Sequence, residues 1–494
     1  MAITMKYLLG IDFGGGASKA TLLCENGTIA ATNTVEYPTF YPMPGYTEQN
    51  PEDWYKATVE NISAVLEKSS INPSDIEMIS LDAATHTAVL TDYDFNVVRP
   101  SIYWTDTRSV KQAEFLKTNC RELIKSLVLH EPDTIWTLPQ LMWLRENEPE
   151  TLEKTKRIMF AKDYVRHCLT GDYVTDFIEA EGSMMFDYTR QEWSGELCSF
   201  SGIDSDMLPN AVSPLETAGY VTSAAAGETG LCEGTPVIVG STDTVMEVFA
   251  SGAVLKGQMT LKLATAGRIC IITDKAYPDK NLINYSHVSD GLWYPGTATK
   301  SCAASYRWYR DTFGESYDVL DRGAETISPG ADGLIFHPYL NGELTPYGNP
   351  SLRASFTGVS AGHTKAHFTR AVLEGVSMSL LDCKNEIEKI GIPHGDSAFV
   401  IGGGGKSPLW RKITADITGI TLIENKYSDS SFGSCMLAGA AAGVWNSLSD
   451  AVSACNTPVS KTVPDSESHE KYLKIFAKYK DIQSALEAVY NKEY

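Results

Sequence analysis

The 494 residues predict an α/β protein built from two similar domains. The first observation is a strand, a glycine turn and a second strand at the N-terminus, over residues 6–24. The second is an echo of this unit at residues 257–273, where two apolar strands flank a turn of small residues. The third is the length of the chain, which indicates more than one domain because domains average roughly 100–200 residues. We expect the halves to meet near residue 250 and to hold a ligand cleft between them.

The elements of the first half follow from periodicity and turn residues. Residues 6–12 form an apolar strand, and Gly14, Gly15 and Gly16 turn the chain into a second strand that ends before the Asn26-Gly27 hairpin turn. A third strand at 29–35 continues a meander, whereas in a Rossmann domain a helix follows the glycine turn. The pattern further predicts helices at 51–68, 143–155, 160–169 and 243–251, and strands at 76–81 and 235–240.

The second half contains a long helical pattern at residues 367–388 and a short strand at 398–401. That strand runs into Gly402–Gly405, and a helix begins at Pro408. Two more helices are predicted at 434–444 and 468–490.

Composition and charge exclude several classes of partner. The net charge is −21, from 41 basic and 62 acidic side chains, so nucleic acid and membrane surfaces are not expected partners. A local phosphate site built from backbone N–H groups remains compatible with this charge. The ten cysteines are scattered without a Cys-x-x-Cys pair, which favours reduced thiols in a cytoplasmic protein. The N-terminal residues lack the pattern of a secretory signal, and no apolar run approaches the ~18 residues of a membrane span.

Two glycine motifs could hold phosphate groups. Asp12 lies beside Gly14–Gly16, where a carboxylate can hold hydrated Mg²⁺ while the turn N–H groups face phosphate oxygens. An ordinary hairpin turn explains the same residues. Gly402–Gly405 permit positive φ and a close approach of a nucleotide to a helix N-terminus. A flexible loop is the alternative, but such a loop rarely lies between a core strand and a helix that starts at Ser407-Pro408.

Three further positions could bind or activate a sugar. Asp243 follows a buried strand at the start of a helix, where it either caps the helix or acts as a general base. His86 lies between two threonines, and a lone histidine is more often structural than functional. The segment Trp104–Arg108 combines an aromatic ring, a carboxylate and a guanidinium, which suit sugar binding but equally form a surface ion pair.

Taken in order, these motifs resemble the FGGY family of carbohydrate kinases, and the likeness runs over nearly the whole chain. A single motif of this kind has low specificity, but many in the right order are specific. The matching segments are Asp12–Lys19, Trp104–Arg108, Gly240–Asp243, Pro338–Pro346, Ala354–Val359 and Gly402–Ser407.

The resemblance implies an α/β fold of two actin-like ATPase (ribonuclease H-like) domains with an interdomain cleft that closes over ATP, Mg²⁺ and sugar. The implied first domain, residues 1–248, carries the sugar site and the catalytic aspartate. The second, residues 249–494, carries the adenosine site. Whether its last helix packs back on the first domain is left open. Phosphoryl transfer of this kind requires positioning and charge stabilisation more than covalent chemistry.

The resemblance also implies roles for individual residues. Asp243 would be the catalytic base and Asp12 would assist catalysis, and both would serve the metal. The sugar would be faced by Thr85, His86, Trp104 and Asp106 together with Asp243. The nucleotide would be bound by Gly14, Gly15, Gly16, Lys19, Thr265, Gly267, Gly403, Gly404 and Ser407.

The chain departs from the family pattern on the phosphate side. Gly15 stands where the family usually has threonine, and Gly16 where serine or threonine is common, so those hydroxyl contacts fall to backbone N–H groups or to Ser18. The second turn has Ala264 where glycine is usual, and Ala303-Ala304 replace frequent glycines at the following helix.

The expected reaction transfers the γ-phosphoryl group of ATP to a hydroxyl of a small sugar, with D-xylulose to D-xylulose 5-phosphate favoured by a xylulokinase-like pattern. Xylulokinases usually carry Met-His flanked by Gln and Gly, whereas this chain has Ala84–Thr87, so gluconate, ribulose, tetritol and glycerol stay open. A non-catalytic actin-like ATP-binding protein is the alternative from another class. The expected partners are the sugar and ATP, and a homodimer is left open.

Overall fold

The computed structural model describes residues 5–492, and the chain separates into two compact units. Unit 1 comprises Met1–Val254, Tyr285–Gly291 and Tyr427–Asn456, and unit 2 comprises Leu255–Asn284, Leu292–Lys426 and Thr457–Tyr494. Two segments of the predicted second domain therefore fold with unit 1.

The sheet of unit 1 begins with the predicted meander. β1 (Tyr7–Phe13) pairs antiparallel with β2 (Ala17–Cys24) and parallel with β5 (Ile76–Ala83), and β2 continues antiparallel into β3 (Ile29–Glu36). The strand order is β13-β14-β5-β1-β2-β3, with β15 also paired to β5. The other three strands are β13 (Thr217–Tyr220), β14 (Pro236–Ile238) and β15 (Ser241–Thr242).

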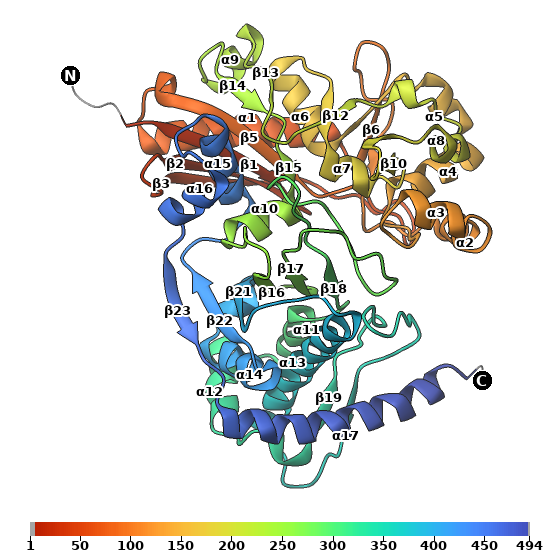
Figure 1. Cartoon of the computed structure of the whole chain (residues 1–494), viewed down its shortest axis with the longest axis vertical. Helices are drawn as coiled ribbons and strands as arrows, with labels where there is room; N and C mark the ends of the chain where they lie inside the picture. Colours follow the sequence, from red (N-terminus) through yellow and green to blue (C-terminus); the bar gives the residue numbers. More distant parts are fainter. Residues whose placement is uncertain (1–4, 493–494) are drawn as a thin grey trace. The chain divides into compact units, whose positions relative to one another are not determined.

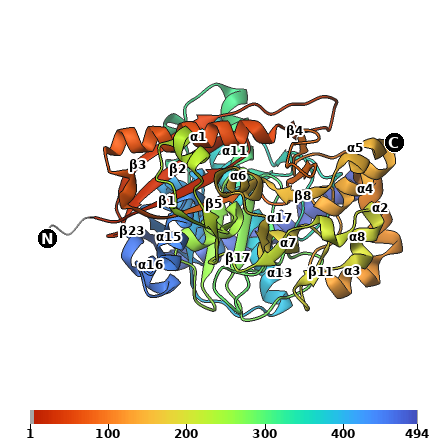
Figure 2. The same ribbon diagram turned by 90° about the horizontal axis from the view of Figure 1, so that it is seen from above.

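Two helices cover opposite faces of this sheet, α1 (Pro51–Ser69) and α15 (Ser430–Ala441) (Figure 2). Side chains alternate along β1, so Leu9 and Ile11 belong to the same apolar core as Trp54 of α1. Gly10 points to the α15 face, where a Cβ atom would lie 2.1 Å from the carbonyl oxygen of Ser431. The sheet and α15 can pack this closely only because residue 10 has no side chain.

The predicted helix at 143–155 is two helices in the structure. α4 (Thr137–Asn147) ends before Pro149, which cannot donate the backbone hydrogen bond that a continuing helix needs, and Pro149 starts α5 (Pro149–Lys154).

The remaining elements of unit 1 are β4 (Glu48–Gln49), β6 (Ala88–Thr91), β7 (Ser101–Ile102), α2 (Val110–Asn119), α3 (Arg121–Leu127), β8 (Arg157–Phe160), α6 (Ala161–Thr170), β9 (Val174–Asp176), α7 (Phe177–Gly182), β10 (Phe186–Asp187), β11 (Glu192–Trp193), α8 (Gly195–Ser201), β12 (Asn210–Val212), α9 (Ser223–Thr229), α10 (Asp243–Ala250) and α16 (Leu448–Cys455).

Unit 2 repeats the arrangement of β2, β1 and β5. β16 (Met259–Leu263) pairs antiparallel with β17 (Gly267–Ile271) and parallel with β21 (Ser397–Ile401), which confirms the predicted echo. The strand order is β18-β17-β16-β21-β22-β23. The other elements are β18 (Gly296–Ala298), α11 (Ala303–Phe313), α12 (Tyr317–Glu325), β19 (Ile335–His337), β20 (Ser355–Thr357), α13 (Lys365–Ile390), α14 (Pro408–Thr418), β22 (Thr421–Asn425), β23 (Pro458–Thr462) and α17 (Ser466–Tyr490).

The last helix, α17, packs within unit 2 beside α14 (Figure 1). Tyr479 is fully buried there, and its hydroxyl lies 2.8 Å from that of Tyr339. Tyr472 is also fully buried and donates to Glu374 at 2.7 Å. α15 and α16 fold with unit 1, whereas α17 belongs to unit 2. Within residues 5–492, no helix combines the length and apolar character that crossing a membrane requires.

Candidate active site

Three aspartates gather at one edge of the unit 1 sheet. Asp12 on β1 and Asp82 on β5 are partners in parallel register. β15 pairs with β5 at the same level, Ser241 with Asp82, and Asp243 follows directly as the first residue of α10. The carboxyl ends of parallel strands meet at one edge, which explains this clustering and makes it a candidate ligand site. We call Asp12, Asp82 and Asp243 the acidic edge.

Burial controls the protonation of the acidic edge. Asp82 has no exposed surface and accepts a hydrogen bond from the Ser434 hydroxyl of α15. Burial raises the pKa of Asp82 well above its ordinary value, and repulsion by Asp12 adds to the rise. Burial also raises the pKa of Asp12 to about 6. Asp82 was not among the predicted site residues, although a fully buried carboxylate is an unusual residue.

The glycine turn between β1 and β2 is held by its carbonyl groups. Tyr37 donates its hydroxyl to the Gly14 oxygen at 2.5 Å, and the Gly15 oxygen accepts from Gln49 at 2.9 Å and Thr39 at 3.1 Å. Gly15 and Gly16 are exposed. None of Gly14, Gly15 and Gly16 has a positive φ, so this turn does not need glycine for its backbone conformation.

Two further residues of β2, Ser18 and Lys19, lie near the turn. Ser18 is paired with Phe13 and fully buried on the α1 side of the sheet, so it cannot replace a turn hydroxyl on the side of Asp12. Lys19 forms an ion pair with Asp429 at 2.9 Å, and its role toward nucleotide stays a prediction.

His86 is fixed through both its backbone and its ring. Its φ is +68°, a conformation that a residue with a side chain keeps only where its surroundings determine it. Its N–H donates to Glu179 at 2.7 Å and its carbonyl accepts from Thr137 at 2.9 Å. Its Nε2 lies 2.9 Å from the Tyr285 hydroxyl, and its ring lies 4.6 Å from that of Trp136, edge on. Thr85, which precedes His86 and is also predicted to face the sugar, is buried.

Two buried glutamates accompany His86. Burial raises the pKa of Glu181 to about 8 and that of Glu179 well above its ordinary value. Glu181 accepts from the N–H of Ser286 at 2.9 Å and from its hydroxyl at 2.6 Å. The surroundings of His86 therefore disfavour negative charge. No local sequence pattern points to Tyr285 or Ser286, because both come from the distant segment Tyr285–Gly291.

The segment Trp104–Arg108 divides into an exposed ring and a buried ion pair. Trp104 is 41% exposed. Asp106 is buried and accepts from the Arg108 side chain at 2.8 and 3.0 Å and from the Thr47 N–H at 2.5 Å. Arg108 also pairs with Glu48 at 2.8 Å. The Asp106 carboxylate thus stabilises this segment, and its contact with sugar stays a prediction.

The predicted nucleotide residues of unit 2 lie in two turns. Gly402 has a φ of +89°, whereas Gly403 has an ordinary φ and is exposed. A Cβ atom on Gly404 would lie 2.6 Å from the Trp410 ring. Ser407 caps α14 by accepting from the Trp410 N–H at 3.1 Å and donates to Asp321 at 2.7 Å.

In the second turn, Thr265 is exposed, and its carbonyl accepts from the Cys302 N–H at 2.9 Å. Gly267 is buried, with its N–H donating to Thr299 at 3.0 Å. These assignments toward nucleotide stay predictions.

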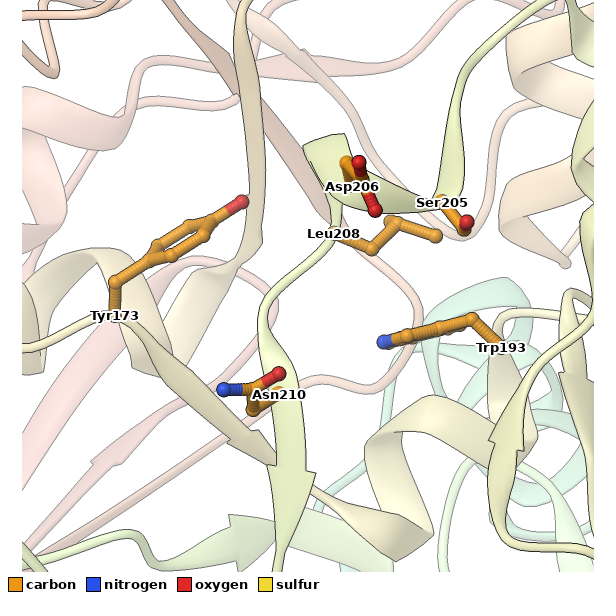
Figure 3. Close-up of a pocket in the computed structure, with 6 residues that line it drawn as sticks. All are labelled: Tyr173, Trp193, Ser205, Asp206, Leu208 and Asn210. Carbon is orange, nitrogen blue, oxygen red and sulfur yellow. The ribbon is translucent and has the colours of Figure 1, made fainter.

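A pocket of about 360 Å³ in unit 1 contains none of the predicted residues. Tyr173 and Trp193 flank it (Figure 3). The Tyr173 hydroxyl donates to the Met207 oxygen at 2.6 Å and the Trp193 indole to the Pro209 oxygen at 2.7 Å, so both polar groups serve the backbone. The remaining lining residues are Ser205, Asp206, Leu208 and Asn210.

Comparison with known proteins extends the resemblance to both halves of the chain. Residues 7–250 match the N-terminal domain, and residues 272–442 the C-terminal domain, of the FGGY family of carbohydrate kinases. Xylulose kinase of Bacillus subtilis (strain 168) is 33% identical over 488 residues, covering 97% of each chain. Gluconokinase of the same organism is 29% identical over 504 residues, covering 98% of this chain and 97% of that relative.

Solved structures agree with this assignment. A ligand-bound xylulose kinase from Lactobacillus acidophilus has a TM-score of 0.92 at 25% identity, covering 98% of this chain and 99% of the other. Gluconate kinase from the same organism has a TM-score of 0.91 at 25% identity, covering 99% of both chains. The predicted two-domain, actin-like ATPase fold is confirmed. The chain belongs to the FGGY family of carbohydrate kinases.

Proposed function

We propose that this carbohydrate kinase phosphorylates a neutral ketose, converting D-xylulose and ATP to D-xylulose 5-phosphate and ADP. Similar proteins include both a xylulose kinase and a gluconokinase, so likeness alone does not choose between these substrates. The observation that carries the choice is the environment of His86, which is buried and disfavours anions.

The raised pKa of Glu179 and of Glu181 supports this description, because desolvation by burial is the main cause of both shifts. An aldonate carboxylate beside these groups would meet the same penalty. The basic residues of the neighbouring network are already neutralised, since Lys162 pairs with Asp163 and Asp176, and Arg166 with Asp163 and Asp172. The hydroxyl and carbonyl groups of a neutral ketose can bind here without a countercharge.

Asp243 is the proposed base. One of its oxygens accepts from the Thr244 hydroxyl at 3.1 Å. An ionised carboxylate can accept the proton of a sugar hydroxyl, which is the role proposed for Asp243. As the sugar oxygen bonds to the γ-phosphorus, the bond from that phosphorus to the β,γ-bridging oxygen breaks, ADP leaves, and the hydroxyl proton passes to Asp243. Positioning of the sugar by His86 orients the attacking oxygen.

Within the acidic edge, Asp12 and Asp243 are the residues proposed to bind Mg²⁺. Oδ1 of Asp12 is buried and has no hydrogen-bond partner within the described residues. Mg²⁺ is usually bound by one or two carboxylates together with substrate phosphates and water. In this proposal Asp12 and Asp243 would hold the ion, which would neutralise charge on the phosphoryl group.

Gluconate is the second candidate substrate, supported by the gluconokinase relatives. Ribulose, a tetritol and glycerol belong in the same comparison. Binding of ATP without transfer would instead indicate a non-catalytic actin-like protein.

A coupled assay of ADP release with saturating MgATP tests the proposal. We expect D-xylulose to give the highest kcat/KM in a panel that includes D-gluconate, D-ribulose, erythritol and glycerol. Asp243→Asn should lower turnover ~10²–10⁴-fold with nucleotide affinity retained. The control is Asp94→Asn, at an exposed position. A preference for gluconate would refute the choice of substrate, and full activity of Asp243→Asn would refute the base.

A further inference from the structure

The glycine turn beside Asp12 contains no side-chain hydroxyl, since Gly14–Gly16 are followed by Ala17 and Ser18 faces the other side of the sheet. A phosphoryl group at this turn would thus have backbone N–H groups as its only donors from the turn itself. Another hydroxyl is present at the same place. The phenol oxygen of Tyr103 lies 3.4 Å from the point that a Cβ atom on Gly15 would occupy.

The main chain holds Tyr103 in this position. Tyr103 follows β7, its N–H donates to the Thr47 oxygen at 2.9 Å, and its carbonyl accepts from the Asp106 N–H at 2.9 Å. The residue is only 5% exposed, so its ring has little freedom to turn away from Gly15.

The surroundings of the phenol preserve it as a donor. Burial, Asp243 and Asp12 all raise the pKa of Tyr103, so the O–H proton stays in place at neutral pH.

A second tyrosine at the turn has a different role. The hydroxyl of Tyr37 donates to the Gly14 oxygen at 2.5 Å, which commits its proton to the backbone of the turn. Tyr37 shapes the turn, whereas Tyr103 lies over Gly15 and near both Asp12 and Asp243.

We propose that Tyr103 contacts the transferred phosphoryl group, its phenol O–H donating to a phosphate oxygen above Gly15 in place of a hydroxyl from the turn. The inference rests on the proposed function, which assigns phosphoryl transfer to Asp12, Asp243 and this turn. It adds a donor from Tyr103, which directly precedes the segment Trp104–Arg108.

The test compares Tyr103→Phe with wild type. One lost hydrogen bond to a charged group should lower kcat/KM for ATP by roughly 10- to 100-fold. The KM for sugar and the affinity for ADP, which lacks the transferred group, should stay unchanged. Adding Gly15→Thr to Tyr103→Phe should restore most of the loss, because the threonine hydroxyl would occupy the space near the missing phenol oxygen and the backbone φ at residue 15 permits a side chain.

Two controls separate this role from a structural one. Tyr220→Phe removes a phenol from an exposed residue of β13 and should match wild type. Tyr37→Phe should also lower activity, but Gly15→Thr should not rescue it, because the lost bond shapes the turn.

Unchanged kcat/KM for ATP in Tyr103→Phe would overturn the inference, as would a loss that affects sugar and ADP equally and is not rescued. The proposed function is judged separately, by wild-type turnover on a sugar and its loss in Asp243→Asn. If the wild-type protein is an active kinase and Tyr103→Phe does not change its kinetics, the proposed function still holds and only the role of Tyr103 is refuted.

Discussion

At the scale of single residues, His86 shows most clearly how structure constrains function. It keeps a positive φ while its N–H, carbonyl and ring are each bonded to a different partner, Glu179, Thr137 and Tyr285. A strained backbone held by three contacts is typical of a residue whose placement matters beyond folding.

His86→Ala should raise the KM for sugar at least ~10-fold and leave the KM for ATP unchanged, because a hydrogen bond to substrate is lost. His86→Asn serves as the second variant, since asparagine tolerates positive φ better than alanine and separates backbone strain from loss of the imidazole. Steady-state kinetics with each substrate varied in turn provide the measurement. Equal losses for both substrates, or a much lower melting temperature for both variants, would favour a purely structural histidine.

At the scale of elements, the loop between β21 and α14 contains glycines with different tasks. Gly402 needs glycine for its positive φ, and Gly404 because Trp410 and the Leu263 carbonyl leave no room for a Cβ atom. Gly403 meets neither condition, since nothing lies within 4 Å of its would-be Cβ. Of these three residues, only Gly403 is required to be glycine neither by its φ nor by the packing of its neighbours. This supports the prediction that Gly403 lies beside the nucleotide.

Gly403→Ala and Gly404→Ala form a matched pair. We expect Gly403→Ala to keep the wild-type melting temperature and to weaken binding of a non-hydrolysable ATP analogue in calorimetry. Gly404→Ala should lower the melting temperature by several degrees, because a clash in a packed core costs about 1–3 kcal/mol. Undiminished ATP affinity in Gly403→Ala would remove this residue from the nucleotide site.

At the scale of the whole molecule, buried acids connect stability to pH. Glu181 in unit 1 and Glu343 in unit 2 have their pKa raised by burial to about 8, from an ordinary value of 4.5. Between these two values the unfolded chain releases the protons that the folded chain keeps. Ionisation of these groups therefore penalises folding progressively as pH rises from about 4.5 to about 8.

Glu181→Gln should flatten part of this dependence, because an amide needs no proton to remain neutral. The melting temperature between pH 5 and pH 9 is the measurement, with the exposed Glu60→Gln as control. Wild type and the control should lose stability more steeply toward pH 8 than Glu181→Gln does. Parallel curves for all three proteins would contradict the raised pKa.

Much of the fold was determined by the sequence alone. The opening meander, the second strand–turn–strand unit and most helices were predicted because apolar periodicity and turn residues act over short distances. The order of the motifs also identified the family, and with it the expected roles of Asp12 and Asp243. The helix predicted at 143–155 is wrong in extent, because Pro149 cannot continue α4 and instead begins α5.

Only the tertiary structure decided which distant residues meet. Tyr285 reaches His86 across 199 positions of sequence, and Ser434 reaches Asp82 across 352. Tyr103 was assigned no role until the fold placed its phenol beside Gly15. Such pairings depend on how whole elements pack, through register, face alternation and close helix approach, and local patterns in the sequence do not encode them. The sequence thus determined the elements and the family, whereas packing decided the composition of the site.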